Sequence, residues 1–90
     1  MLEKNINLIN TLVWLKRPDI DNSAWTLGVI RGFTNKMVKC EDLYRPEYTQ
    51  EKRNVGNFKL KNVRLLTDEE WSSDSGSYYK QVQKQIRERA

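Results

Sequence analysis

The sequence contains no histidine and only one cysteine in 90 residues. Without histidine, a Ser-His-Asp triad, a histidine general base and a Cys/His zinc cluster are all excluded. The single cysteine, Cys40, has no partner within the chain for a disulfide. Paired carboxylates, a nucleophile beside a base and a glycine-rich phosphate loop are also missing at the spacings that catalysis uses. We therefore expect a protein that is not an enzyme and that holds no metal and no cofactor.

Long apolar runs are missing as well. No stretch approaches the roughly 20 apolar residues that span a bilayer, and the first residues lack the basic and then apolar pattern of a secretion signal. Ninety residues form one modest core without room for a deep cavity. We expect a cytoplasmic protein, or a nuclear one in a eukaryote, that is not secreted and has no membrane partner and no small-molecule substrate.

Charge is unevenly distributed along the chain, whose formal net charge is +4. Residues 1–66 carry 12 Lys and Arg against 7 Asp and Glu, whereas residues 67–77 carry 4 acidic residues and no basic ones. Residues 78–90 again carry 4 basic residues against 1 acidic residue. A basic body and a basic tail favour a polyanionic partner, although the same charges also serve as ordinary solvated surface.

β-Branched and aromatic residues in short runs between turn formers indicate a mainly β protein. Along the second run, Trp25, Leu27, Val29 and Phe33 share one face with Arg31. Gly28 and Gly32 have no side chains on the opposite face, which permits the close approach of neighbouring strands and the bend that a small barrel needs. Cys40 alternates with charged neighbours and is expected in the core. The strands are expected over residues 11–17, 25–33, 36–44, 58–61 and 64–66.

The last third of the chain predicts helices. Thr67 and Glu70 have the spacing of a capping box, so a short helix carrying Trp71 should follow and lie back on the strands. Capping explains this acidic run better than cation binding, because calcium-loop spacing is missing. The predicted organisation is a barrel with its lead-in and capping helix over 1–71, a flexible linker over 72–77 and a basic amphipathic helix over 78–90.

Two motifs resemble the small SH3-like barrels of the Tudor, Agenet and KOW type. They are Trp25-x-x-Gly28-Val29-Ile30 and the closing Leu60-Lys61-Asn62-Val63-Arg64-Leu65-Leu66. The resemblance covers residues 10–66 and implies a single five-stranded SH3-like barrel with a C-terminal helical extension. It also implies binding rather than catalysis: of nucleic acid or the transcription and translation machinery for KOW-type domains, and of methylated Lys or Arg for Tudor-type domains. The chain lacks the compact glycine-centred KOW loop, and its loop at 45–57 is longer than either pattern.

Interleaved basic and aromatic residues favour nucleic acid, DNA or RNA, as the partner. Lysine and arginine would neutralise phosphates, and tyrosine could stack on bases, with little sequence specificity because no recognition helix is evident. The candidate residues are Lys16, Arg17, Arg31, Lys36, Lys39, Tyr44, Arg45, Tyr48, Lys52, Arg53, Lys59, Lys61 and Arg64.

Two alternatives remain open. The first is a small adaptor or inhibitor, of the kind found among viral accessory proteins, that binds a larger protein or a second copy of itself through the long loop at 45–57 and the C-terminal helix. Its candidate residues lie in the tail and are Tyr79, Lys80, Val82, Lys84, Ile86 and Arg87. The second is an aromatic cage for methylated Lys or Arg peptides, formed by Trp25, Phe33, Tyr44 and Tyr48.

Overall fold

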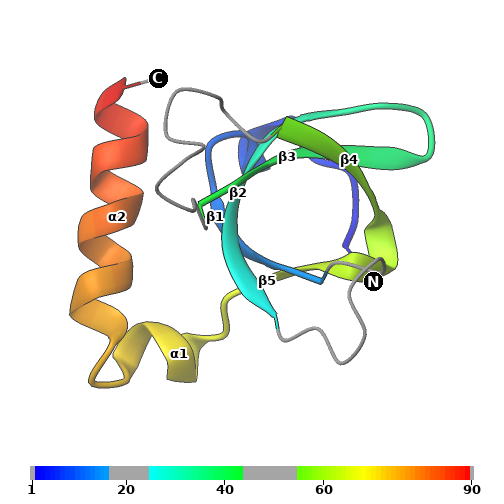
Figure 1. Cartoon of the computed structure of the whole chain (residues 1–90). Coiled ribbons are helices and arrows are strands. Elements are labelled where there is room, and N and C mark those ends of the chain that lie inside the picture. Colours follow the sequence, from blue (N-terminus) through cyan, green and yellow to red (C-terminus); the bar gives the residue numbers. More distant parts are fainter. Residues whose placement is uncertain (1, 17–24, 44–54, 90) are drawn as a thin grey trace, which may run out of the picture.

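The computed structural model describes residues 2–16, 25–43 and 55–89 (Figure 1). Five antiparallel strands form one sheet in the order β4-β3-β2-β1-β5, and two α-helices follow. The elements are η1 (Ile6–Leu8), β1 (Leu12–Leu15), β2 (Thr26–Phe33), β3 (Met37–Asp42), β4 (Val55–Lys59), η3 (Leu60–Asn62), β5 (Val63–Leu65), α1 (Asp68–Ser72) and α2 (Gly76–Arg89).

The prediction of five strands followed by a C-terminal helix is confirmed, and the content of sheet and helix is compatible with a mainly β protein. The sheet curls strongly (Figure 1), but the barrel is not closed, because β4 and β5 are the two edges of the sheet and are joined in sequence by the single turn of η3. β4 begins at Val55, inside the segment expected to be a long loop, since its first residues pair with Glu41, Cys40 and Lys39 of β3. Those first residues are exposed, so the sequence shows no apolar alternation there.

One face of the sheet lines the inside of the curl. Alternate residues of β1 to β3 point there, as the period of two along a strand requires. Leu2 and β5 close the same cluster, and Cys40 is fully buried in it, as the sequence predicted. The buried members are Leu2, Val13, Leu15, Ile30, Val38, Cys40 and Val63.

The opposite face of the sheet is covered by α2, which stands outside the curl (Figure 1). Ile86 is 8% exposed and packs with the buried Leu12 and Val29. Trp71 packs on the edge of the same cluster, so it lies back on the strands as predicted. The sheet is therefore buried on both faces across its centre, which a single barrel layer would not achieve.

A β-bulge changes which face the end of β2 presents. The register with β3 shifts between Ile30 and Gly32, so an extra residue is inserted at Arg31. Phe33 consequently packs with Ile30 inside the curl, whereas Leu27 and Val29 face α2. Uninterrupted alternation placed Phe33 with Leu27 and Val29; that assignment is wrong because the bulge reverses the parity.

Gly28 provides a close approach between strands, and Gly32 does not. A Cβ at Gly28 would lie 2.7 Å from Leu15 Cγ and 2.9 Å from the carbonyl oxygen of Glu41. Such separations are too short for any side chain larger than hydrogen. Around Gly32, no described atom would lie within 4 Å of a Cβ. The sequence therefore identified the right role for one of the two glycines.

The two helices meet at a tight corner. Thr67 accepts a hydrogen bond from the Glu70 backbone N–H, and the Glu70 side chain accepts one from the Thr67 N–H, which confirms the capping box. α2 begins at Gly76, two residues before the predicted start, because the turn after Ser72 needs only Ser73 to Ser75. A Cβ at Gly76 would collide with the carbonyl group of Trp71, so glycine is required for this corner.

Candidate nucleic-acid interface

Four exposed lysines lie together around the β3–β4 ladder and η3. On these strands, alternation directs Val38 and Phe58 into the core and leaves the flanking residues outside. Met37 is paired with Lys59, and Lys39 is paired with Asn57, which brings the basic side chains of both strands to one side. We call this set the lysine surface; its members are Lys36, Lys39, Lys59 and Lys61.

A hollow of about 440 Å³ lies within the lysine surface. Met37 and Leu60 provide apolar lining, and the lysines at 36, 59 and 61 surround it. No acidic residue contributes to this lining, and in the described part of the chain no ion pair involves the four lysines. The local charge is therefore positive and available to an external anion.

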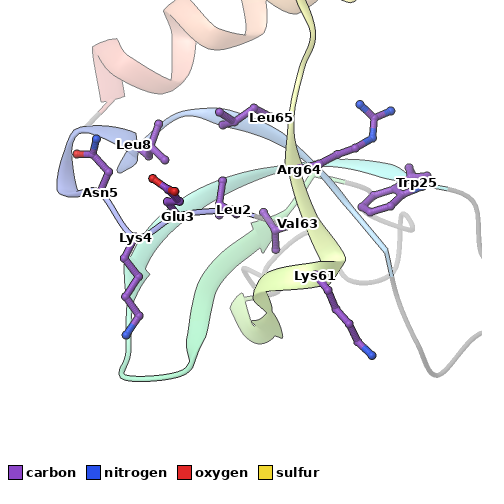
Figure 2. A pocket seen from close by; sticks show the side chains of 10 residues that line it. All are labelled: Leu2, Glu3, Lys4, Asn5, Leu8, Trp25, Lys61, Val63, Arg64 and Leu65. Atoms are coloured by element: carbon purple, nitrogen blue, oxygen red, sulfur yellow. The ribbon is translucent and has the colours of Figure 1, made fainter.

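A larger groove has a volume of about 690 Å³, and Figure 2 shows the side chains that line it. Lys61 contributes to the lining of both depressions. In Figure 2, Leu2 and Val63 lie in the middle of the groove, with Trp25 toward one end and Lys4 toward the other. The groove is lined by Leu2, Glu3, Lys4, Asn5, Leu8, Trp25, Lys61, Val63, Arg64 and Leu65.

Arg64, one of the predicted phosphate contacts, is held by groups of its own chain. Its guanidinium lies 3.0 Å from one Glu70 carboxylate oxygen and 3.4 Å from the other. It also lies over two indole rings, 5.7 Å from the centroid of Trp14 and 5.4 Å from that of Trp25. Hydrogen bonds from Arg64 and from the Thr67 backbone lower the pKa of Glu70 to about 2. Arg64 therefore fixes the Trp25 end of the groove instead of offering a free charge.

Arg31 is likewise engaged within the chain. Its Nε and Nη2 donate to one carboxylate oxygen of Glu41, at 3.0 and 2.8 Å, and its Nη1 donates to Asn10 Oδ1 at 2.6 Å. The Glu41 side chain is only 3% exposed, so the arginine compensates a buried carboxylate. Arg31 is consequently committed to the sheet and lies on the face opposite the core of the curl.

Of the remaining predicted nucleic-acid contacts, Lys16 is exposed beside η3, where its backbone N–H donates to the Asn62 carbonyl at 2.9 Å. This contact places a further basic residue next to the lysine surface. Six of the predicted contacts lie outside the described residues: Arg17, Tyr44, Arg45, Tyr48, Lys52 and Arg53.

The two described members of the predicted aromatic cage are separated. Trp25 lines the groove next to Arg64, whereas Phe33 packs on the cluster inside the curl. The other two members, Tyr44 and Tyr48, lie outside the described residues. The indole of Trp25 contacts the guanidinium of Arg64, 5.4 Å from its centroid, and lies in the groove instead of beside Phe33.

The apolar stripe of α2 is occupied by its own sheet. Ile86 is buried, Tyr79 and Val82 pack on the same cluster, and the Tyr79 ring meets Trp14 edge to face at 5.8 Å. The basic residues predicted with them, Lys80, Lys84 and Arg87, are exposed on the other side of the helix. The stripe therefore stabilises the fold, and only the basic side of α2 faces outward.

Gln83 attaches α2 to the edge of β1, a contact that sequence reasoning missed. Its Nε2 donates to the Asn10 carbonyl, and its Oε1 accepts from the Leu12 N–H, each at 2.7 Å. β5 pairs with Val13 to Leu15 only, so the backbone of residues 10–12 lies beyond the end of that ladder. The Gln83 side-chain amide hydrogen-bonds this backbone, as a residue of a neighbouring strand would. One glutamine among three in the helix carries no sequence signal that marks it.

The described residues contain no group of three or more His, Cys, Asp and Glu side chains placed to hold a metal ion. Cys40 is buried, and burial raises the pKa of its thiol to about 12, so it remains protonated at neutral pH. None of the helices that the structure describes is long and apolar enough to cross a membrane. Comparisons with protein-family models, with curated proteins and with solved structures found no match.

Proposed function

We propose that this protein is a non-enzymatic module that binds nucleic acid through the lysine surface, with little sequence specificity. The observation that carries the proposal is the cluster itself: exposed lysines from the turn before β3, from β4 and from η3 surround one hollow whose lining contains no carboxylate. A phosphate backbone is the polyanion that such a surface suits, because each neutralised phosphate releases a condensed counterion.

Low specificity follows from the types of contact available. Lysine side chains contact phosphates as flexible point charges and distinguish bases poorly. A helix that reads a DNA groove must present an accessible face with base-contacting residues. α2 is instead fixed to β1 by Gln83 and by its apolar stripe. The interaction should accordingly depend strongly on salt and weakly on sequence.

The curled sheet is, in this proposal, a variant of the SH3-like barrel. Two features support it: the single turn of η3 between the last two strands, and the close approach at Gly28 on the second strand. The helix that covers the outer face of the sheet is an addition to that plan. An adaptor role through the tail stripe is not proposed, because Tyr79, Val82 and Ile86 already pack on the sheet.

The test is fluorescence anisotropy with labelled 12-nucleotide single strands and 12-base-pair duplexes of mixed sequence. If the four lysines each neutralise one phosphate, affinity should fall between 50 and 200 mM salt about 150-fold for the duplex and about 50-fold for the single strand. For three contacts, the expected losses are about 40-fold and about 20-fold. Lys59→Glu with Lys61→Glu should weaken binding at least tenfold and flatten the salt dependence.

The matched control is Lys80→Glu with Lys84→Glu, which makes the same change in net charge on the outer side of α2. This control should bind within about threefold of the unchanged protein at 150 mM salt, where distant charges are screened. Two results would contradict the proposal: no binding of either oligonucleotide at 50 mM salt, or equal losses in the two double variants.

A further inference from the structure

We infer that the nucleic acid is single-stranded, and that an unpaired base enters the groove at Trp25 while its flanking phosphates lie along the lysine surface. This inference rests on the proposed function and specifies its ligand. It follows from the form of the groove, from Lys61, which the groove shares with the lysine surface, and from the position of the Trp25 indole.

The groove combines an apolar middle with a charged rim. Leu2, Val63 and Leu65 line it together with Leu8, and Lys61 lines both the groove and the smaller hollow. Its volume of about 690 Å³ lies within the range of about 300–1,000 Å³ that small-molecule sites occupy. A phosphate backbone alone would leave the apolar lining in water, so the complementary ligand has a planar apolar part as well as negative charge.

Lys61 is the residue that the groove and the hollow of the lysine surface share. Lys36 and Lys59 line the smaller hollow with Lys61, and in Figure 2 Lys61 and Trp25 lie on the same side of the larger groove, opposite Lys4. The positive charge of Lys61 and the aromatic ring of Trp25 thus line the same side of the groove. One strand can place phosphates at the lysines and a base at Trp25.

Trp25 is held in position by its neighbours. Arg64 covers its ring at 5.4 Å, and the Glu70 carboxylate fixes Arg64 from the start of α1. The indole remains half-buried and lines the groove, so its orientation is set before a ligand arrives. Base stacking on a preset aromatic side chain is the main sequence-tolerant contact of single-strand binding proteins.

A duplex cannot make the same contact. Each base of a double helix has both faces covered by stacked neighbours and its pairing edge occupied, so only its groove edges are accessible. Binding a duplex would use the lysines but leave the groove unfilled. An acidic peptide with apolar residues offers charge without a large planar group, and it serves below as the competing ligand.

The experiment compares three labelled ligands on the full chain at 100 mM salt: a 12-nucleotide thymidine strand, the same backbone without bases, which has the same number of phosphates, and a 12-base-pair duplex, which has about twice the charge density. The thymidine strand should bind about tenfold more tightly than the duplex and about tenfold more tightly than the abasic strand, within the roughly 5- to 150-fold that one stacked base contributes. The abasic comparison leaves the protein unchanged, so it does not depend on any variant folding.

Trp25→Leu should remove most of the preference for the thymidine strand over the abasic strand while leaving abasic binding within about twofold. Trp71→Leu is the matched control, because Trp71 is also half-buried but packs beside α2 away from the groove. Circular dichroism establishes that both variants are folded.

The outcomes separate this inference from the proposed function. Equal binding of all three ligands overturns the single-strand inference and leaves nucleic-acid binding intact, as does tighter binding to the duplex. Failure of all three to bind overturns both. Displacement of the thymidine strand by an equimolar glutamate-rich 12-residue peptide containing leucine also overturns the inference, since the groove would then prefer a peptide.

Discussion

Gln83 is the side chain that joins α2 to the edge of β1, so replacing it measures how firmly the helix is held. We choose Gln83→Glu, because the new carboxylate can still accept from the Leu12 N–H but can no longer donate to the Asn10 carbonyl. The change is nearly isosteric, so packing around Ile86 should not be altered. What is lost is one partly buried hydrogen bond, and one carbonyl is left facing a negative oxygen.

The expected cost is about 1–3 kcal/mol in the free energy of unfolding, the range for leaving a buried polar group without its partner. The assay is urea unfolding at pH 7, followed by far-ultraviolet circular dichroism and tryptophan fluorescence. Gln85→Glu is the control, because it adds the same charge to the same helix at an exposed position and should change stability by less than about 0.5 kcal/mol. At pH 4, partial protonation of the introduced carboxyl restores a donor, so the gap between the two variants should narrow.

Equal losses of stability in Gln83→Glu and Gln85→Glu would refute the reasoning, because they would show that the added charge matters and the contact with β1 does not. A gap that widens toward pH 4 would refute it as well, since a protonated carboxyl can donate where the carboxylate cannot.

The remaining predictions concern the core and one ion pair. Gly28→Ala should cost about 1–3 kcal/mol of unfolding free energy, because its Cβ would overlap Leu15; Gly32→Ala, with open space at its Cβ, should be neutral or stabilising by up to about 1 kcal/mol in the same urea assay. The lowered pKa of Glu70 means that its stabilising contribution is complete above pH 4.5 and is lost as the pH falls toward about 2, so Glu70→Gln should show a flatter decline of stability in that window. The raised pKa of Cys40 means that the protonated thiol stabilises the fold fully below pH 9 and that this stabilisation is lost as the pH rises toward 12. At pH 8, a thiol reagent should therefore modify the native protein only as fast as it unfolds.

Each of these has a contrary result. Equal stability of Gly28→Ala and Gly32→Ala would show that Leu15 and the neighbouring strand move aside at no cost. If the stability of Glu70→Gln falls with acid as steeply as that of the unchanged protein, the ion pair does not contribute to stability. Rapid modification of Cys40 without denaturant would show that the thiol is accessible, against its full burial in the structure.

Local patterns in the sequence predicted the elements that depend on local chemistry. The capping box at Thr67 and Glu70 requires only two side chains three residues apart, and it forms as expected. The alternation around Cys40 is likewise visible in the chain, since strand side chains alternate between faces. Gly28 was identified because a glycine within a β-branched run commonly marks a close approach.

Features that depend on partners distant in the sequence could not be predicted in this way. The start of β4 at Val55 follows from the ladder offered by β3, and the bulge at Arg31 reverses the face of Phe33 without any local signal. The contacts of Gln83 with β1 join positions 71 and 73 residues apart. Charge alone suggested that Arg31 was available to a ligand, but it compensates a buried carboxylate.

The candidate interface was predicted in part for the same reason. Lys36, Lys39, Lys59 and Lys61 were among the predicted contacts, and strand pairing brings them together. The groove beside them was not predicted, because it is formed by the first residues of the chain, by the start of β2 and by β5. Such a depression exists only after these segments have been assembled.

The most direct test of nucleic-acid binding through the lysine surface is a titration of the ¹⁵N-labelled protein with a 12-nucleotide thymidine strand, followed by amide chemical shifts. The account predicts that the largest changes lie at residues 36–39 and 59–61, extend to Trp25, and are reduced at higher salt. Shifts confined to the outer side of α2, or no shifts at millimolar strand concentration in low salt, would contradict it.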